Sequence, residues 1–195
     1  MARKVVPEKV EEAKEKIIIA TMDLIVQEGF SKLTLANVAE RAGITKAAIY
    51  WYFSNKDELI NSMTSSLKET FIDDTKKIAL LPISPKEKIE AYFCALENIE
   101  IRNKCFFLIK AFVELCYTND EARTIIQSGY REYTEILQEV FDEAINGGEL
   151  KTEIPSSILT KILVATIDGC VVHAEMFGVD WIDLKEVRHF YMSLV

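Results

Sequence analysis

The sequence has few of the side chains that bind metals or form disulfides. It contains two histidines, His173 and His189, and neither lies four residues from a second strong ligand. The cysteines include no C-x-x-C pair, and all of them lie within apolar runs: Cys94, Cys105, Cys116 and Cys170. We therefore expect no metal site, no bound cofactor, and buried, reduced thiols. The first three cysteines recur at a regular interval, which leaves a thiol sensor as an alternative. A helix break predicted near Asn103 favours instead the interpretation that these cysteines occupy unrelated positions in the core.

Motifs of common enzyme and membrane classes are also missing. The sequence has no Gly-rich phosphate-binding loop and no nucleophile elbow, so we do not expect an enzyme. No stretch reaches the roughly 18 to 20 uninterrupted apolar residues of a membrane span. Residues 1–16 lack the apolar run of a signal peptide. We therefore expect a cytoplasmic protein that does not associate with a membrane.

The remaining patterns predict helices. Beyond Leu59 no strand-like alternation of polar and apolar residues occurs, and helix-capping residues recur. Ser84, Pro85 and Glu87, for example, predict an N-cap, a first-turn proline and a capping box. The expected fold class is all-α. About nine helices are predicted, spanning roughly residues 8–28, 34–42, 45–53, 56–80, 85–102, 104–117, 120–145, 155–177 and 183–195.

Residues 34–53 have the pattern of two short helices around a glycine turn. Thr34 is the expected N-cap of the first helix, and Gly43 ends that helix in a left-handed conformation. Ile44 then places an apolar side chain between the two helices, and Thr45 caps the second. This arrangement is a helix-turn-helix, which indicates DNA binding.

The second short helix has two different faces. Ile49 and Phe53 lie on one side and are expected to be core. The opposite side carries residues at spacings of three and four that we expect to face solvent: Lys46, Ala47, Tyr50 and Trp51. A short helix fits the ~12 Å width of the B-DNA major groove, where lysine donates to guanine and aromatic edges pack on thymine methyl groups. The alternative is that both aromatic residues are buried against later helices.

A third helix start follows directly. Asn55 is its expected N-cap, and Glu58, three residues on, is expected to complete a capping box. The free N–H groups of its first turn, together with Lys56, can hold a DNA phosphate.

The segment EGFSKLTLANVAERAGITKAAIYWYFSNKDEL, residues 28–59, resembles the N-terminal domain of the TetR family of bacterial transcriptional regulators. The likeness extends from about Lys14 to Leu59. It rests on the aromatic residue after Glu-Gly, the Ala-x-x-Ala-Gly-Ile turn, and the tail I-Y-x-Y-F-x-N-K-x-E-L. The resemblance implies a three-helix DNA-binding domain, residues 1–55, and a helical ligand-binding and dimerisation domain, residues 56–195.

The resemblance also implies which side chains bind DNA. Thr34 and Tyr52 would contact phosphates. Ala47 and Ala48 stand where many relatives carry Gly, Pro, Ser or Thr, which leaves open the number of hydrogen bonds made from there. The predicted DNA-binding residues are Thr34, Thr45, Lys46, Ala47, Tyr50, Trp51, Tyr52 and Lys56.

The charge distribution is compatible with DNA binding although the net charge is −8. Residues 1–60 contain 9 Lys and Arg and 9 Asp and Glu, whereas residues 61–195 contain 14 and 22. Screening by salt limits the electrostatic effect of an exposed charge to about 10 Å at moderate salt, so a distant acidic domain has little effect on DNA binding. The basic side chains expected near DNA are Arg3, Lys4, Lys32, Lys46 and Lys56.

Two stretches are more apolar than a chain of this size can easily cover. Residues 105–117 are expected to be buried nearly all round, and residues 158–177 carry only a few polar interruptions. The C-terminal HFYMSLV adds a third apolar surface. We infer that the last two helices pack against a second copy about a two-fold axis. Such a homodimer can place its two copies of the DNA-recognition helix, residues 45–53, ~34 Å apart on a palindromic operator.

Aromatic residues in the second domain predict a mostly apolar ligand pocket. A packed core has the same composition, so this alternative stays open, although the resemblance favours a pocket. Asp168 and His173 either anchor a ligand or form a hydrogen bond between helices across the dimer. The predicted ligand-binding residues are Phe93, Phe107, Phe112, Tyr130, Tyr133, Asp168, His173 and Phe177.

These patterns and the resemblance together imply a TetR-like homodimeric repressor that a small, largely apolar inducer releases from a palindromic operator on double-stranded DNA. The ligand would favour a state in which the long helix, residues 56–80, swings and separates the two DNA-binding domains of the dimer. One alternative is a non-inducible nucleoid or architectural DNA-binding protein without a cavity. Another is a helical small-molecule-binding protein or enzyme in which the N-terminal domain is incidental.

Overall fold

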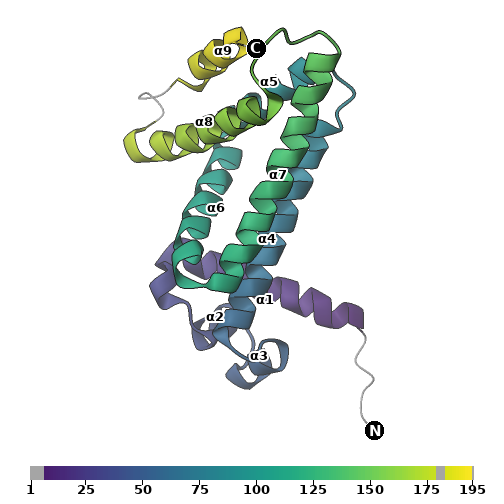
Figure 1. The fold of residues 1–195 in the computed structure, drawn as a ribbon. Helices are drawn as coiled ribbons and strands as arrows, with labels where there is room; N and C mark the ends of the chain where they lie inside the picture. Colours follow the sequence, from purple (N-terminus) through teal and green to yellow (C-terminus); the bar gives the residue numbers. More distant parts are fainter. Residues whose placement is uncertain (1–6, 179–182, 195) are drawn as a thin grey trace. The chain divides into compact units, whose positions relative to one another are not determined.

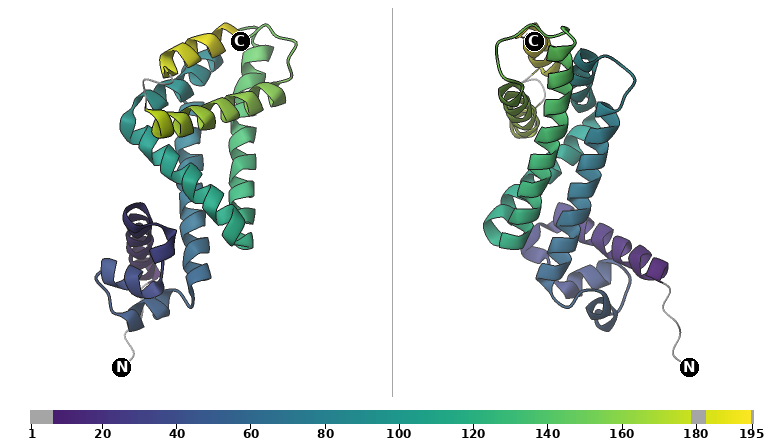
Figure 2. Two further views of the ribbon diagram at one scale, coloured as in Figure 1. Left: turned by 90° about the vertical axis from the view of Figure 1, so that its left-hand side faces the viewer. Right: turned by 45° about the vertical axis from the view of Figure 1, so that its right-hand side comes forward.

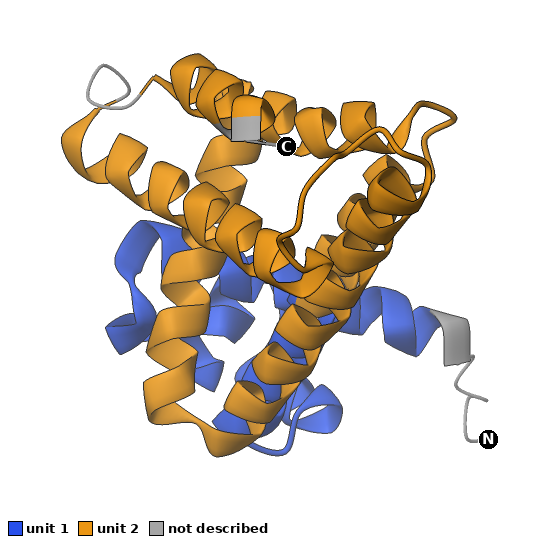
Figure 3. Cartoon of the chain, turned by 45° about the horizontal axis from the view of Figure 1, so that its top comes forward, with its two compact units in different colours: residues 1–67 blue, residues 68–195 orange. Residues whose placement is uncertain are grey.

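The computed structural model describes residues 7–178 and 183–194. Within these ranges the chain forms nine α-helices and one 3-10 helix and no strand (Figure 1), which confirms the all-α fold class. The chain divides into two compact units, Met1–Leu67 and Lys68–Val195 (Figure 3). The boundary lies inside helix α4, Lys56–Ala79, so the first turns of this helix belong to the first unit. The predicted basic arm of Arg3 and Lys4 lies outside the described residues.

The first unit is a small bundle of helices. Three helices precede α4: α1, Pro7–Glu28; α2, Leu35–Arg41; and α3, Lys46–Tyr52. A 3-10 helix, Phe30–Lys32, joins the first two. Helix α2 packs against both α1 and α3. Fully buried apolar side chains of this unit come from these helices, their connections and the first turns of α4: Ile17, Leu24, Leu33, Val38, Ile49, Phe53, Leu59 and Met63.

The turn between α2 and α3 is a Schellman motif. Gly43 has a φ of +68°. Its N–H donates to the carbonyl of Glu40 at 3.1 Å, and the N–H of Ile44 donates to the carbonyl of Ala39 at 2.9 Å. These bonds satisfy the last carbonyl groups of α2 and reverse the chain over two residues. The predicted roles of Gly43 as helix stop and of Thr34 and Thr45 as N-caps are confirmed.

Gly43→Ala is expected to lower the free energy of unfolding by about 1–2 kcal/mol, because a Cβ is disfavoured at positive φ. No heavy atom lies within 4 Å of a Cβ built there, so packing adds nothing to the cost. Gly43→Asn is the matched control, since asparagine tolerates the left-handed conformation and should retain more of the stability. Urea unfolding measures both variants, and equal losses would contradict this account of the turn.

The second unit contains the later half of α4 and five further helices. These are α5, Pro85–Glu97; α6, Ile99–Thr118; α7, Asp120–Asn146; α8, Ser156–Phe177; and α9, Leu184–Leu194. Helix α7 packs against α5, α6 and α8, while α9 packs against α5 (Figures 1 and 2). The core of this unit includes large side chains that are fully buried: Ile89, Phe93, Leu137, Phe141 and Leu163.

Polar contacts hold α4 within this unit. Glu132 of α7 accepts from Lys76 at 3.0 Å and from Lys68 at 3.4 Å, both on α4. The Tyr92 hydroxyl of α5 donates to the carbonyl of Thr75 at 3.0 Å. Helix α4 is therefore tied to α5 and α7 along its last three turns.

The predicted helix break at Arg102-Asn103 is wrong. Helix α5 ends at Glu97, and α6 begins at Ile99 and continues through both residues. The break lies at Asn98, whose side-chain oxygen accepts the N–H groups of Glu100 at 2.8 Å and Ile101 at 3.3 Å. An N-cap hydrogen bond at this position starts the new helix earlier than expected. The predicted N-cap at Ser84 is confirmed, with its capping box to Glu87.

Helix α6 is less buried than predicted. Leu108, Phe112 and Leu115 form its buried face, but Val113 and Tyr117 are exposed. The expectation of burial nearly all round is therefore wrong for this chain alone, because spacings of three and four bring only one face of α6 onto α7 and α8.

The prediction of buried thiols is also wrong in part. Cys170 is buried, whereas Cys105 and Cys116 are half-buried and Cys94 is exposed. Cys94 lies on the side of α5 that faces α9, where the Arg188 guanidinium donates to its sulfur at 2.5 Å. A polar contact with α9 therefore takes the place of an apolar environment.

Helix α8 has the length and mean hydropathy of a membrane-spanning helix. The core helix of a soluble protein has the same properties, and α8 packs against α6 and α7 in this unit. Lys161, Asp168 and Glu175 also interrupt its apolar sequence. The packing therefore accounts for its composition.

Candidate nucleic-acid interface and ligand cavity

Helix α3 has the two faces that its sequence predicts. Ile49 and Phe53 are 0% exposed, whereas Tyr50 is 51% and Trp51 is 59% exposed. Lys46 and Ala47 are exposed beside them. The alternative that both aromatic residues are buried is wrong. The exposed face combines a donor, small side chains and two aromatic edges, which is the chemistry that reads bases in a major groove.

Several contacts hold α3 in place. The Thr45 hydroxyl accepts the N–H of Ala48 at 3.1 Å and caps the helix. The Lys14 ammonium of α1 lies 5.8 Å from the centroid of the Phe53 ring, at the buried end of α3. The Trp51 ring packs edge-on against Tyr52, with centroids 4.8 Å apart. The exposed side chains therefore project from a fixed helix.

Helix α2 is anchored to α1 by a charged contact. The Arg41 guanidinium donates to the Glu28 carboxylate at 2.7 Å and to the Gln27 side-chain oxygen at 2.8 Å. Both partners lie at the end of α1, so the ion pair fixes the last turn of α2. The Gly43 turn then sets the direction of α3.

The predicted phosphate contacts flank α3. Thr34 is exposed at the start of α2, Tyr52 is half-buried at the end of α3, and Lys56 is exposed in the first turn of α4. The Thr34 oxygen already accepts the N–H of Asn37 at 3.2 Å, which leaves its hydroxyl hydrogen free to donate. Thr45 is exposed as well. The DNA contacts of these side chains stay predictions.

The N-terminus of α4 differs in detail from the predicted capping box. The side chain of Asn55 accepts the N–H of Glu58 at 2.8 Å, as expected. The Glu58 carboxylate accepts the N–H of Ser54 at 2.7 Å, however, and not that of Asn55. The long side chain reaches back to the donor before the N-cap. This hydrogen bond holds the pKa of Glu58 below its ordinary value.

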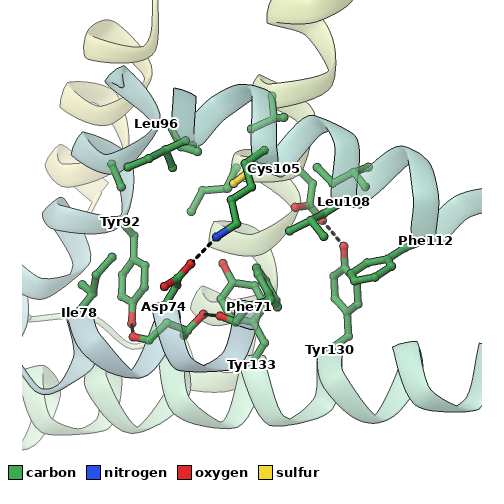
Figure 4. Close-up of a pocket in the computed structure, with 18 of the residues that line it drawn as sticks. Phe71, Asp74, Ile78, Tyr92, Leu96, Cys105, Leu108, Phe112, Tyr130 and Tyr133 are labelled. Atoms are coloured by element: carbon green, nitrogen blue, oxygen red, sulfur yellow. Dashed lines mark hydrogen bonds and ion pairs between the residues drawn. The ribbon is translucent and has the colours of Figure 1, made fainter. Parts of the chain in front are cut away.

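The second unit contains a cavity of about 360 Å³ (Figure 4). Five helices contribute to it, namely α4, α5, α6, α7 and α8. Most of the lining is apolar or aromatic, with a few charged side chains among it. Representative lining residues are Phe71, Asp74, Ile78, Tyr92, Leu96, Lys104, Cys105, Leu108, Phe112, Tyr130, Tyr133 and Asp168.

Half of the predicted ligand-binding residues line this cavity: Phe112, Tyr130, Tyr133 and Asp168. The other half lie elsewhere. Phe93 is buried in the core, and Phe107 is half-buried on α6, one position from Leu108 on the cavity side. His173 lies with its ring centroid 5.8 Å from that of Phe177, which is exposed. These four lie at other positions around their helices, which composition cannot reveal. Ligand binding by all eight stays a prediction.

Sequence reasoning missed the contribution of α4. Phe71, Thr75 and Ile78 recur at spacings of three and four and face the cavity. That periodicity is visible in the sequence and would have indicated an apolar face on this helix. Tyr92 and Leu96 of α5 repeat the same spacing.

Two carboxylates of the cavity lining have opposite environments. Asp74 accepts from Lys104 at 2.7 Å and from Lys77 at 2.8 Å, and these bonds lower its pKa. Asp168 accepts the hydroxyl of Tyr130 at 3.3 Å (Figure 4), and burial raises its pKa to about 6. Burial also raises the pKa of Tyr130, so its hydroxyl is protonated and can donate at neutral pH. Among the described residues, no three His, Cys, Asp or Glu side chains are grouped to hold a metal.

Asp168→Asn is expected to stabilise the ligand-free protein at pH 7.5 by roughly 1–3 kcal/mol. The folded-state pKa of about 6 lies above the ordinary value of 3.8, so the fold favours the protonated carboxyl. The stability that Asp168 contributes is therefore fully present below about pH 4 and is lost as the pH rises through about 6. Urea unfolding across this range should show a steeper decline for the parent protein than for the variant.

Asp142→Asn is the matched control for this pH dependence, since Asp142 is exposed on α7. It should leave the pH profile of the parent protein unchanged. A stability difference between Asp168→Asn and the parent that is the same at every pH would contradict the burial of this carboxylate.

Comparison with known proteins finds relatives among bacterial transcriptional regulators. The family model described as "Bacterial regulatory proteins, tetR family" matches residues 17–63. The chain is 43% identical over 178 residues to the HTH-type transcriptional regulator TtgR of Pseudomonas putida, covering 84% of this chain and 80% of the relative.

Solved structures have the same fold. A TetR transcription regulator from Haloarcula marismortui ATCC 43049 is 19% identical and matches with a TM-score of 0.79, covering 94% of this chain and 96% of the other. The transcriptional regulator FadR from Bacillus subtilis, solved in complex with stearoyl-CoA, is 25% identical with a TM-score of 0.69, covering 92% and 96%.

Proposed function

The chain belongs to the TetR family of bacterial transcriptional regulators, and from this premise we propose that it is a homodimeric repressor that leaves its operator when a small, largely apolar ligand fills the cavity. The observation that carries the DNA-binding part is the exposure of Tyr50 and Trp51 on a helix whose opposite face is fully buried. Packing within the unit does not require two neighbouring aromatic residues of one helix to be exposed to solvent, so their exposure indicates an interaction surface.

We propose that α3 enters the major groove while its flanks hold the DNA backbone. Lys46, Tyr50 and Trp51 would contact base edges. Thr34, Tyr52 and Lys56 would contact phosphates on either side and fix the register of the helix. These two roles follow from position, because the base-contacting residues lie along the exposed face of α3 and the phosphate-contacting residues lie around its ends.

Exposed apolar side chains on α8 and α9 support a dimer. They include Ile158, Ile162, Met176 and Phe177 on α8 and Phe190 on α9. A second copy that packs against them about a two-fold axis would remove this surface from water. It would also provide two α3 helices for the two half-sites of a palindrome.

Helix α4 supports a link between the ligand and the DNA. Lys56 lies in its first turn, and Phe71 and Ile78 in its last turns line the cavity. A ligand that contacts the cavity face of α4 can favour one placement of this helix over another. Such coupling is typically ~1–3 kcal/mol, which corresponds to a 5- to 150-fold change in operator affinity, and it is reciprocal. The stearoyl-CoA bound by the FadR relative is a ligand with a long apolar chain.

A selected-site binding assay with the full-length protein at fixed salt tests this proposal. We expect enrichment of a palindromic site and a lower affinity for that site when a cavity ligand is added. Binding without sequence preference would favour the architectural alternative. A ligand-binding protein that enriches no DNA at all would favour a small-molecule carrier or an enzyme.

Lys56→Ala is expected to weaken binding to all DNA sequences alike, because a phosphate contact carries no base information. The slope of log affinity against log salt should fall by about 1. Lys110→Ala removes the same charge from an exposed position on α6 and is the matched control. Fluorescence anisotropy with operator and scrambled duplexes measures both variants. A loss confined to the operator would contradict a phosphate role for Lys56.

A further inference from the structure

Asp168 is a carboxylate with no cationic partner among the described residues, and it lines an aromatic cavity. We propose that this cavity binds an amphipathic organic cation whose positive group lies against Asp168 and the neighbouring tyrosine rings. This inference rests on the proposed function of the cavity as the effector site. It narrows the ligand from apolar molecules in general to those that carry one positive charge on an apolar body.

The other charged residues of the lining contact one another. The Asp74 carboxylate binds both Lys77 and Lys104, at 2.8 and 2.7 Å. Among the described residues, the hydrogen-bond partner of Asp168 is the neutral hydroxyl of Tyr130, at 3.3 Å. Within the described part of the lining, Asp168 is therefore the charged group that has no contact with an opposite charge.

Aromatic rings surround the region of Asp168. The centroid of the Tyr130 ring lies 6.3 Å from that of Phe112 and 6.4 Å from that of Tyr133. Phe71 packs edge-on against Tyr133, with centroids 4.7 Å apart (Figure 4). Ring faces attract cations, and a carboxylate beside several rings is the chemistry that recognises substituted ammonium groups.

The cost of the unpaired carboxylate gives a reason for the preference. Burial raises the pKa of Asp168 to about 6, so most Asp168 side chains are ionised at pH 7.5, with a neutral hydroxyl as their partner. A bound cation supplies a counter-charge, whereas an anionic ligand would bring a second negative charge into the same low-dielectric space. A neutral ligand would leave the Asp168 carboxylate without a counter-charge.

The rest of the cavity suits an apolar body. Ile78 and Leu96 line it near Tyr92, on the side away from Phe112 and Tyr130 (Figure 4). A volume of about 360 Å³ falls in the range of small-molecule sites. Asp168 and its aromatic neighbours would therefore hold the positive group of an amphiphile, and the aliphatic side chains of the lining would contact its apolar body.

Three probes with the same ten-carbon chain test the proposal: decyltrimethylammonium, 1-decanol and decanoate. Calorimetric titration of the full-length protein at pH 7.5, below the aggregation concentration of each probe, gives their affinities. We expect the cation to bind at least about 10-fold more tightly than the alcohol, and decanoate to bind most weakly. Asp168→Asn should lower the affinity for the cation roughly 10- to 100-fold and leave that for the alcohol nearly unchanged.

Two further variants keep the result specific. Tyr130→Phe retains the ring and the carboxylate, so it should keep the preference for the cation. Asp142→Asn removes an exposed carboxylate of α7 and should change none of the affinities. Equal binding of the three probes, tighter binding of decanoate than of the cation, insensitivity of the cation affinity to Asp168→Asn, or no binding at all would overturn the proposal.

Operator release measured in the same samples separates this inference from the proposed function. If the alcohol binds and releases the operator as well as the cation does, the repressor function stands and the cation preference fails. If the cation binds through Asp168 without releasing DNA, the ligand class stands and the proposed coupling fails.

Discussion

Replacing Tyr50 and Trp51 together by alanine is expected to lower operator affinity by roughly 30- to 20,000-fold, equivalent to ~2–6 kcal/mol. Each aromatic residue would lose its contacts with base edges, and each such contact typically contributes ~1–3 kcal/mol. The fold should survive the change, because more than half of each side chain is exposed while the core residues Ile49 and Phe53 are untouched. Fluorescence anisotropy at fixed salt gives the affinity.

The comparison with scrambled DNA decides whether this loss concerns sequence recognition. The double variant should bind a scrambled duplex nearly as well as the parent protein does, since its phosphate contacts are intact. Tyr117→Ala removes an aromatic residue that is 84% exposed on α6 and should leave operator binding unchanged. An equal loss on both duplexes would contradict base reading by α3.

Ile158→Glu combined with Ile162→Glu is expected to separate the dimer. The two positions lie one turn apart on α8 and are exposed in the single chain. In the proposed interface they would bring like charges from both copies into an apolar contact, which should raise the dimer dissociation constant by roughly 100-fold or more. Operator affinity should fall by about 10²- to 10⁴-fold, because a monomer engages only one half-site.

Sedimentation velocity and anisotropy measure these two effects on the same samples. Val113→Glu is the matched control, since Val113 is also an exposed apolar residue but lies on α6. It should remain dimeric and bind the operator normally. A parent protein that sediments as a monomer, or a double variant that remains dimeric, would contradict the proposed interface.

Local signals made the DNA-binding unit predictable. The caps at Thr34 and Thr45, the left-handed Gly43 and the two faces of α3 depend on residues within a few positions of one another. Periodicity then decided burial, because Ile49 and Phe53 cannot face the core unless Tyr50 and Trp51 face away from it. The all-α fold class followed from the same capping and spacing rules.

The cavity was less predictable because it depends on how helices pack. Phe107 and Leu108 are neighbours of similar character, yet only Leu108 faces the cavity. His173 and Phe177 follow Asp168 on α8 but lie at other positions around that helix, and composition does not distinguish them. The break at Asn98 was missed for a related reason. An asparagine within a helical pattern marks a helix start only when its side chain accepts backbone N–H groups, as Asn98 does from Glu100 and Ile101.

Dimethyl sulfate protection of the selected operator tests most directly the claim that two α3 helices read successive major grooves. The reagent methylates guanine N7 in the major groove and adenine N3 in the minor groove. We predict N7 protection in two half-sites centred about 10 base pairs apart, and loss of this protection with the Tyr50 and Trp51 double variant. Protection of adenine N3 alone, or of a single half-site, would contradict the account.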